Sequence, residues 1–236
     1  PIKTLDAAKR RLADVLSADE RRALMLAMAR DVLTALVRCP ALRGVVIVSR
    51  SPEADALAQA FGTERFTESP DADLSAALTQ AADYAGARLG ARGILIVPAD
   101  VPLITPEEVA RVLEGHEAVT IMPDDEHVGT NGLACTPPDR IPLKFDGRSF
   151  KPHVDAAFAA GAQPRILPGT RFDLDVDTPD DLRALLARGP GTQTAAFLHR
   201  TGIAKRLGAA WGAAGRPVRD AHNDRPNSPR GRPMAA

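Results

Sequence analysis

Cysteine is scarce in this chain of 236 residues, which contains only Cys39 and Cys135. The two lie far apart and match no metal-ligand spacing and no redox motif, so we expect buried thiols in a reducing compartment. Long apolar runs and a signal peptide are also missing, and the sequence therefore predicts a cytoplasmic protein with no membrane partner. Because the chain begins with Pro1 rather than Met, we expect a few residues, and most of a first strand, to precede it.

A charge surplus of one sign is missing as well, because 30 Lys and Arg balance 30 Asp and Glu. The balance is uneven: residues 199–236 hold eight basic and two acidic residues, a net charge of +6, which leaves −6 for residues 1–198. An acidic surplus disfavours binding to nucleic acid, whose backbone needs clustered cations. For the basic tail we expect a solvated segment.

Strand and helix patterns alternate through the first half of the chain, in a composition of 44% apolar and 25% charged residues that is ordinary for a globular protein. This alternation predicts an α/β fold with a mostly parallel, doubly wound mixed sheet and helices on both faces. The expected strands lie at 44–49, 65–67 and 94–97, and the expected helices at 17–38, 53–61, 74–89 and after Thr105.

The second half is less regular. We expect strands at 118–122, 132–136 and 172–176, a turn at 129–132, and helices at 153–160 and after Thr178. A glycine-proline cluster at 189–191 ends the last of these helices and sets the domain boundary, which gives one domain over 1–188 and an extension over 189–236. In the extension we expect one helix near 194–211, followed by disorder.

Asp100 is the first candidate for chemistry, because it directly follows the aliphatic strand and precedes Pro102. In open α/β sheets, ligands bind beyond the carboxyl ends of the strands. An acid in this place is suited to hold a divalent cation against a substrate phosphate. An aspartate that only caps a turn fits the residues equally well.

A second acidic site is Leu174–Asp181. In an extended segment, Asp175 and Asp177 point to the same side, about 7 Å apart. Convergent carboxylates repel one another unless a cation neutralises them, so this pair beside Asp100 would suit Mg²⁺. The alternative is that Asp177 or Thr178 caps the next helix.

Cations and small residues supply the remaining candidates. Lys3, Lys9 and Arg11 cluster after the presumed first strand, where phosphates are commonly held, although a solvated helix face explains them too. The small-residue loops 129–132 and 146–149 offer hydroxyls and backbone amides, which suit an anion or an ordinary turn.

Five ordered motifs together resemble the 2-phospho-L-lactate guanylyltransferase family, over roughly residues 1–188. They are Pro-Ile-Lys-x-Leu-x-x-Ala-Lys-x-Arg-Leu (1–12), Val-Pro-Ala-Asp-x-Pro-Leu (97–103), Gly-Thr-Asn (129–131), Ser-Phe-x-x-His (149–153) and Leu-Asp-Val-Asp-Thr-Pro-x-Asp-Leu (174–182). The family includes the phosphoenolpyruvate and 3-phospho-D-glycerate guanylyltransferases of coenzyme F-420 biosynthesis.

The resemblance implies a single Rossmann-like nucleotidyltransferase domain of the nucleotide-diphospho-sugar transferase type. It also implies transfer of GMP from GTP to a phosphorylated three-carbon acid, with release of pyrophosphate. The acceptor's own phosphate would be the nucleophile, so no general base is needed. By position, the implied roles are Mg²⁺ binding for Asp100 with Asp175 or Asp177, acceptor binding for Thr130, Gly147 and Ser149, and triphosphate binding for Lys3, Lys9 and Arg11, with Asp100 and Lys9 catalytic.

Two positions depart from the family pattern: Asp146 stands where a glycine is usual, unless Gly147 takes its role, and Ser75 stands where an asparagine is usual. Two other functions stay open. One is a sugar or molybdopterin nucleotidyltransferase, although the usual Leu-x-Gly-Gly loop is absent; the other is a non-catalytic nucleotide-binding module. The choice among 3-phosphoglycerate, phosphoenolpyruvate and phospholactate is also open, as is a homodimer.

Overall fold

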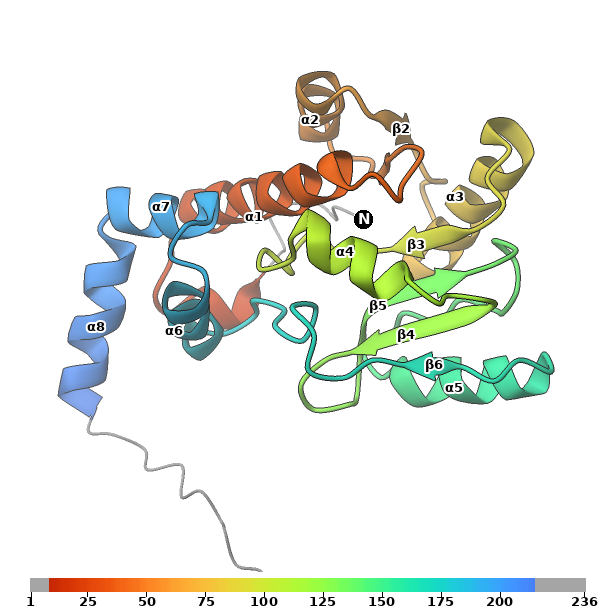
Figure 1. Ribbon diagram of the computed structural model, residues 1–236. Helices are drawn as coiled ribbons and strands as arrows, with labels where there is room; N and C mark the ends of the chain where they lie inside the picture. The colour runs from red at the N-terminus through yellow and green to blue at the C-terminus, as the bar shows by residue number, and fades with distance from the viewer. Residues whose placement is uncertain (1–8, 215–236) are drawn as a thin grey trace, which may run out of the picture.

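The computed structural model describes residues 9–214, and the side chains of residues 9–208 (Figure 1). In chain order the elements are η2 (Arg10–Leu12), α1 (Ala18–Arg38), β1 (Val46–Val48), α2 (Glu53–Phe61), β2 (Glu64–Phe66), α3 (Leu74–Leu89), β3 (Ile94–Ile96), α4 (Pro106–Leu113), β4 (Val119–Pro123), β5 (Thr130–Cys135), α5 (Phe150–Ala159), β6 (Arg165–Ile166), α6 (Pro179–Arg188), α7 (Gln193–Arg200) and α8 (Ile203–Ala214).

The strands form a mixed arrangement in which helices cover both faces. β1 and β2 pair in parallel, and a second sheet has the order β3-β5-β4-β6. β5 runs antiparallel to β3 and β4, whereas β6 is parallel to β4. Because Ile96 pairs with Leu133, the start of β5 lies at the carboxyl end of β3. The α/β fold predicted from the alternating pattern is confirmed.

Successive side chains of β4 point into two different parts of the hydrophobic core. Ile121 packs with side chains of α3 and α5 on one face, and the adjacent Met122 packs with side chains of α1 and α4 on the other. Both residues are fully buried. This period of two is what lets a single strand face two helical layers, which are visible on either side of the sheet in Figure 1.

Local capping explains where the helices begin. Ser17 and Glu20 form the expected capping box of α1, and Thr105 accepts a hydrogen bond from the Glu108 amide at the start of α4. α2 and α3 occupy the predicted spans, 53–61 and 74–89. Side-chain oxygens satisfy amide groups that the first helical turn leaves without partners, and this makes such helix starts predictable.

Two predicted elements were wrong and one was missed. The turn expected at 129–132 is mostly strand, because β5 begins at Thr130 between two partner strands. The strand expected at 172–176 is irregular. Phe172 and Val176, the first and last apolar residues of the alternating pattern, are fully buried, yet the Val176 amide donates to the Asp100 carbonyl outside any ladder. The missed strand is β6, whose two residues are too short for a periodic signal.

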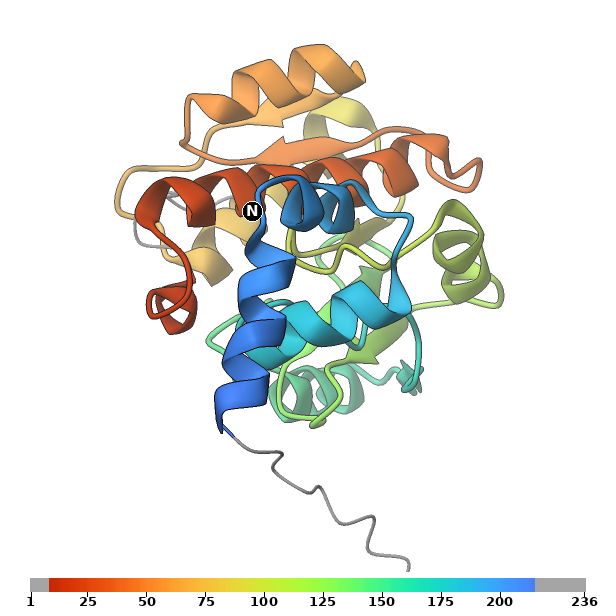
Figure 2. The same cartoon turned by 90° about the vertical axis from the view of Figure 1, so that its left-hand side faces the viewer.

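The predicted C-terminal extension contributes two helices rather than one, with Gly202 in the left-handed conformation between them. Leu198 of α7 and Leu207 of α8 belong to the same buried cluster as Leu24 of α1 and Leu182 of α6. Figure 2 shows α7 lying along α1, with α8 beside α6. The segment expected to be disordered lies, from residue 215 on, outside the described residues. Within residues 9–214, no helix is long and apolar enough to cross a membrane.

Candidate active site

Lys9 is the centre of the candidate site. Its ammonium Nζ lies 2.5 Å from Asp100 Oδ2 and 2.5 Å from Asp177 Oδ1, and its side chain is only 5% exposed. The Lys9 backbone has φ +57°, a left-handed conformation that costs a residue with a Cβ about 1 kcal/mol or more. The two ion pairs hold the residue in this conformation and so fix the ammonium between the two acids.

Opposing effects act on the charge of Lys9. Burial lowers the pKa of the ammonium, but the carboxylates of Asp100 and Asp177 more than offset this, and the net effect raises the pKa above its usual value. Lys9 is therefore a permanent cation at neutral pH. Two carboxylates that would otherwise repel one another are joined by it.

The two acids come from separate loops that are tied together by the backbone. The hydrogen bond from the Val176 amide to the Asp100 carbonyl, 3.0 Å long, joins the loop after β3 to the loop before α6. The capping box of α6 consists of Thr178 and Asp181, so the Asp177 side chain is not the cap and is free to bind Lys9. Thr178 thus caps the helix, and Asp177 belongs to the acidic cluster around Lys9.

The remaining acids of the segment have different partners. Asp175 accepts a hydrogen bond from the Asn131 amide at 3.1 Å. Burial raises the pKa of Asp175; the Asn131 hydrogen bond opposes the rise, and the charges of Asp100 and Asp177 add to it. Asp173 pairs with Arg188 at 2.7 Å and does not join the site.

The other basic residues of the N-terminal motif are less closely placed. The Arg11 guanidinium is 75% exposed and lies 3.9 Å from Asp177, so it borders the site without being held in it. Lys3 lies outside the described residues. Of the three predicted triphosphate-binding cations, Lys9 alone is shown buried among the acids.

The oxygens at Lys9 also fit a divalent cation. Asp100 Oδ1 is buried and has no hydrogen-bond partner within the part of the chain that the structure describes. In the described part of the chain, no three His, Cys, Asp or Glu side chains are grouped as a metal cluster. Mg²⁺, however, is commonly held by one or two carboxylates together with substrate phosphates. Asp100 and Asp177 supply such a pair, and Lys9 lies between them.

The predicted acceptor residues gather on adjoining loops. Thr130 opens β5, and Ser149, which is 2% exposed, immediately precedes α5. The Phe150 amide donates to the Val128 carbonyl at 3.1 Å, which joins the two loops. Because β5 begins at the carboxyl end of β3, this group lies at the same edge of the sheet as Asp100.

Gly147, rather than Asp146, supplies the unusual backbone conformation of the acceptor loop. Its φ of +87° is readily adopted only by glycine, whereas the Asp146 side chain accepts a hydrogen bond from the Arg148 amide at 3.0 Å. The conformation that favours glycine therefore falls at Gly147, one residue later than the glycine of the family pattern. The aspartate acts as an ordinary turn residue.

Three residues of the site had no role assigned from the sequence: Asn131, Ser75 and His153. Ser75 accepts a hydrogen bond from the Phe145 amide at 2.8 Å, which ties the start of α3 to the acceptor loop. His153 is fully buried and lies 3.0 Å from Thr130. Asn131 and His153 both belong to motifs that resemble the family, and His153 follows Ser149 by one helical turn. These positions were the signal in the sequence from which a place in the site could have been predicted.

The buried imidazole makes protein stability depend on pH. Burial lowers the pKa of His153 to about 4 from 6.5, and the Asp146 charge opposes this only in part. Because the folded pKa is depressed, the stabilisation is complete above pH 6.5 and is lost as the pH falls towards 4. The loss over this window amounts to about 3 kcal/mol.

This pH dependence can be tested by urea unfolding at pH 7 and pH 4.5. Between these two pH values we expect the free energy of unfolding to fall more for the wild type than for His153→Asn. Equal decreases in the two proteins would contradict a neutral buried ring.

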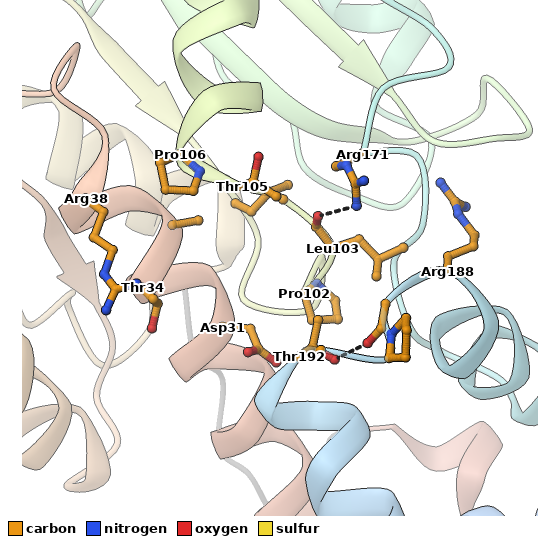
Figure 3. A pocket seen from close by; sticks show the side chains of 15 residues that line it. Asp31, Thr34, Arg38, Pro102, Leu103, Thr105, Pro106, Arg171, Arg188 and Thr192 are labelled. Carbon is orange, nitrogen blue, oxygen red and sulfur yellow. Dashed lines mark hydrogen bonds between the residues drawn. The ribbon is translucent and has the colours of Figure 1, made fainter.

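A hollow of about 350 Å³, separate from the Lys9 cluster, lies next to the loop that follows Asp100 (Figure 3). Two of its charged lining residues are engaged in structural contacts: Asp31 accepts hydrogen bonds from two amides at the start of α7, and Arg188 pairs with Asp173. Neither Lys9 nor Thr130 lines it. The Lys9 cluster, which brings together residues of three sequence motifs, remains the candidate site.

Known proteins match this chain in sequence over most of their length. A family model described as "Guanylyl transferase CofC like" matches residues 1–211. A phosphoenolpyruvate guanylyltransferase of Rubrobacter xylanophilus is 39% identical over 193 residues, which cover 80% of this chain and 92% of that protein. The chain belongs to the CofC-like guanylyl transferase family. A phosphoenolpyruvate guanylyltransferase of Conexibacter woesei is 35% identical over 189 residues, covering 78% and 84% of the two chains.

Solved structures confirm the nucleotidyltransferase fold of this CofC-like protein. A structure from Desulfovibrio desulfuricans, described as a nucleotide-diphospho-sugar transferase, covers 87% of this chain and 95% of its own, with a TM-score of 0.69 at 20% identity. A nucleotidyl transferase from Methanothermobacter has a TM-score of 0.56 at 17% identity and covers 82% and 92%. At these identities the likeness shows the fold alone.

Proposed function

We propose that this protein transfers GMP from GTP to a phosphorylated three-carbon acid and releases pyrophosphate, as a step of coenzyme F-420 biosynthesis. The observation that carries the proposal is the buried Lys9 ammonium between Asp100 and Asp177, at the sheet edge where the acceptor loops begin. Phosphates and carboxylates are the anions that such a set of cations, hydroxyls and amides would receive.

Phosphoenolpyruvate is the first acceptor to test, because the relatives from Rubrobacter xylanophilus and Conexibacter woesei are both named for it. 3-Phosphoglycerate and 2-phospho-L-lactate carry the same two anionic groups on three carbons. The Gly147 turn and the Thr130 and Ser149 hydroxyls would bind those groups in any of the three acids.

The chain's own residues act by placing charge rather than by covalent chemistry. The acceptor phosphate is anionic at neutral pH and attacks the α-phosphorus of GTP without a general base. Lys9 would neutralise charge on the triphosphate, and Asn131 would hold Asp175 beside the acids. Mg²⁺ bound by Asp100 and Asp177, with Asp175 nearby, would screen the repulsion between the reacting phosphates.

Pyrophosphate release tests the proposal. The purified chain would be given each nucleoside triphosphate with each of the three acids, with a sugar 1-phosphate, or with no acceptor; inorganic pyrophosphatase and malachite green would report turnover. We expect release that requires GTP, Mg²⁺ and one of the acids, and a guanylylated acid by mass spectrometry. Turnover with the sugar phosphate alone would indicate another nucleotidyltransferase, and nucleotide binding without turnover a non-catalytic module.

A further inference from the structure

The hydrogen bonds of His153 leave one arrangement of protons for its neutral ring. The Lys144 amide donates to Nε2 at 3.1 Å, so Nε2 carries no proton. The proton of a neutral imidazole then resides on Nδ1. Nδ1 faces Thr130 Oγ1 at 3.0 Å, and therefore donates to that oxygen.

This donation decides what the Thr130 hydroxyl can offer. Its oxygen accepts from His153, so its own proton must point away from the imidazole and toward another acceptor. The ring cannot readily turn over to exchange the two nitrogens, because it is fully buried and lies against Phe145 with 4.8 Å between ring centroids. The Thr130 hydroxyl is thereby held as a hydrogen-bond donor.

A second hydroxyl, that of Ser149, belongs to the same turn of the chain as His153. Ser149 starts the helix that carries His153, and the His153 amide donates to the Ser149 carbonyl at 3.0 Å. The Ser149 side chain is almost wholly buried, and it makes no capping hydrogen bond to the helix that it precedes. One helical turn thus carries both the Ser149 hydroxyl and the imidazole that orients Thr130.

We propose that His153 is a positioning residue, which fixes the Thr130 hydroxyl as a donor to the carboxylate or phosphate of the acceptor acid. The proposal rests on the proposed function, because it assigns a role in binding that substrate. His153 touches no substrate itself. Its contribution is to orient, before binding, a hydroxyl that would otherwise rotate among several partners.

Two substitutions separate the two hydrogen bonds of the ring. In His153→Asn the amide nitrogen occupies roughly the place of Nδ1 and still donates to Thr130. In His153→Gln the longer amide reaches roughly the place of Nε2, serves the Lys144 amide and leaves Thr130 without its donor. Both variants lose the ring, so a purely structural role would affect them alike.

We expect His153→Gln to raise KM for the acceptor about fivefold, the value of one ordinary hydrogen bond, and His153→Asn to change it less than twofold. KM for GTP should stay the same in both. In a Thr130→Val background the Gln substitution should add nothing to KM. Equal changes for Asn and Gln, or full additivity with Thr130→Val, would overturn the proposal.

A measurement on the wild type makes the test independent of how well the variants fold. A long-range ¹H–¹⁵N spectrum of the imidazoles, assigned with His153→Asn, should show His153 protonated on Nδ1 alone at pH 7. A proton on Nε2 would overturn the proposal. If the wild type transfers GMP to none of the acids, the proposed function fails; normal transfer with an acceptor KM unaltered in His153→Gln rejects only the role of His153.

Discussion

Asp100→Asn is expected to lower kcat/KM for GMP transfer about a thousandfold, or about 4 kcal/mol of transition-state stabilisation. The substitution keeps the size of the side chain and removes its charge. Asp100 presents one oxygen to Lys9 and a second, buried oxygen that has no hydrogen-bond partner among the described residues. The carboxylate therefore keeps capacity for the divalent cation that, in the proposed function, would accompany the substrate phosphates.

Stability should change little in Asp100→Asn, because Lys9 keeps its contact with Asp177 at 2.5 Å. Removal of one charge also relieves the repulsion that Asp100 exerts on Asp175. A thermal melt should therefore place the variant within a few degrees of the wild type. Turnover can then be compared between two folded proteins.

Asp173→Asn is the matched control for this substitution. Asp173 lies in the segment that also carries Asp175 and Asp177, but it pairs with Arg188 and not with Lys9. We expect its kcat/KM to stay within about twofold of the wild type, as for a surface ion pair of small energetic value. Equal losses in the two variants would mean that the loss in Asp100→Asn is not specific to Asp100, and normal turnover in Asp100→Asn would remove Asp100 from the site.

The sequence predicts the elements of this fold best where the signals are local. Ser17, Thr105 and Thr178 each begin a helix at the expected residue, because a cap is a contact between neighbours in the chain. The strand prediction for segment 172–176 was wrong because apolar and acidic residues alternate there although the backbone forms no strand. Its backbone is bonded to the loop of Asp100, and that partner lies too far away in sequence for a local pattern to show.

The residues of the candidate site could be named from the sequence, whereas their geometry could not. The motifs named Lys9, Asp100, Asp177, Thr130 and Ser149 as candidates, because each carries a recognisable chemical group. They did not show that Lys9 adopts a left-handed backbone and lies between the acids, since this depends on how three distant segments fold together. The role of Gly147 over Asp146 needed the dihedral angles themselves.

Lys9→Met is expected to lower kcat about a hundredfold, because a charge-assisted contact with the triphosphate is lost and two carboxylates lose their cation. The fold should survive, since Asp100 and Asp177 are 23% and 41% exposed and remain in contact with water. Arg11→Met is the matched control. Its guanidinium is 75% exposed, and we expect less than a threefold change in kcat.

The same substitution should strengthen metal binding in the absence of nucleotide. Lys9 Nζ lies between Asp100 Oδ2 and Asp177 Oδ1, so a divalent cation held by both carboxylates would compete with the ammonium for the same two side chains. With Mn²⁺ as the probe, we expect Lys9→Met to bind the metal more tightly than the wild type by calorimetry and to show a larger rise in Tm on adding it. Asp100→Asn should show neither effect. If Lys9→Met binds Mn²⁺ no better than the wild type, the two carboxylates do not hold the metal together, and the pairing of Asp100 with Asp177 as metal ligands is wrong.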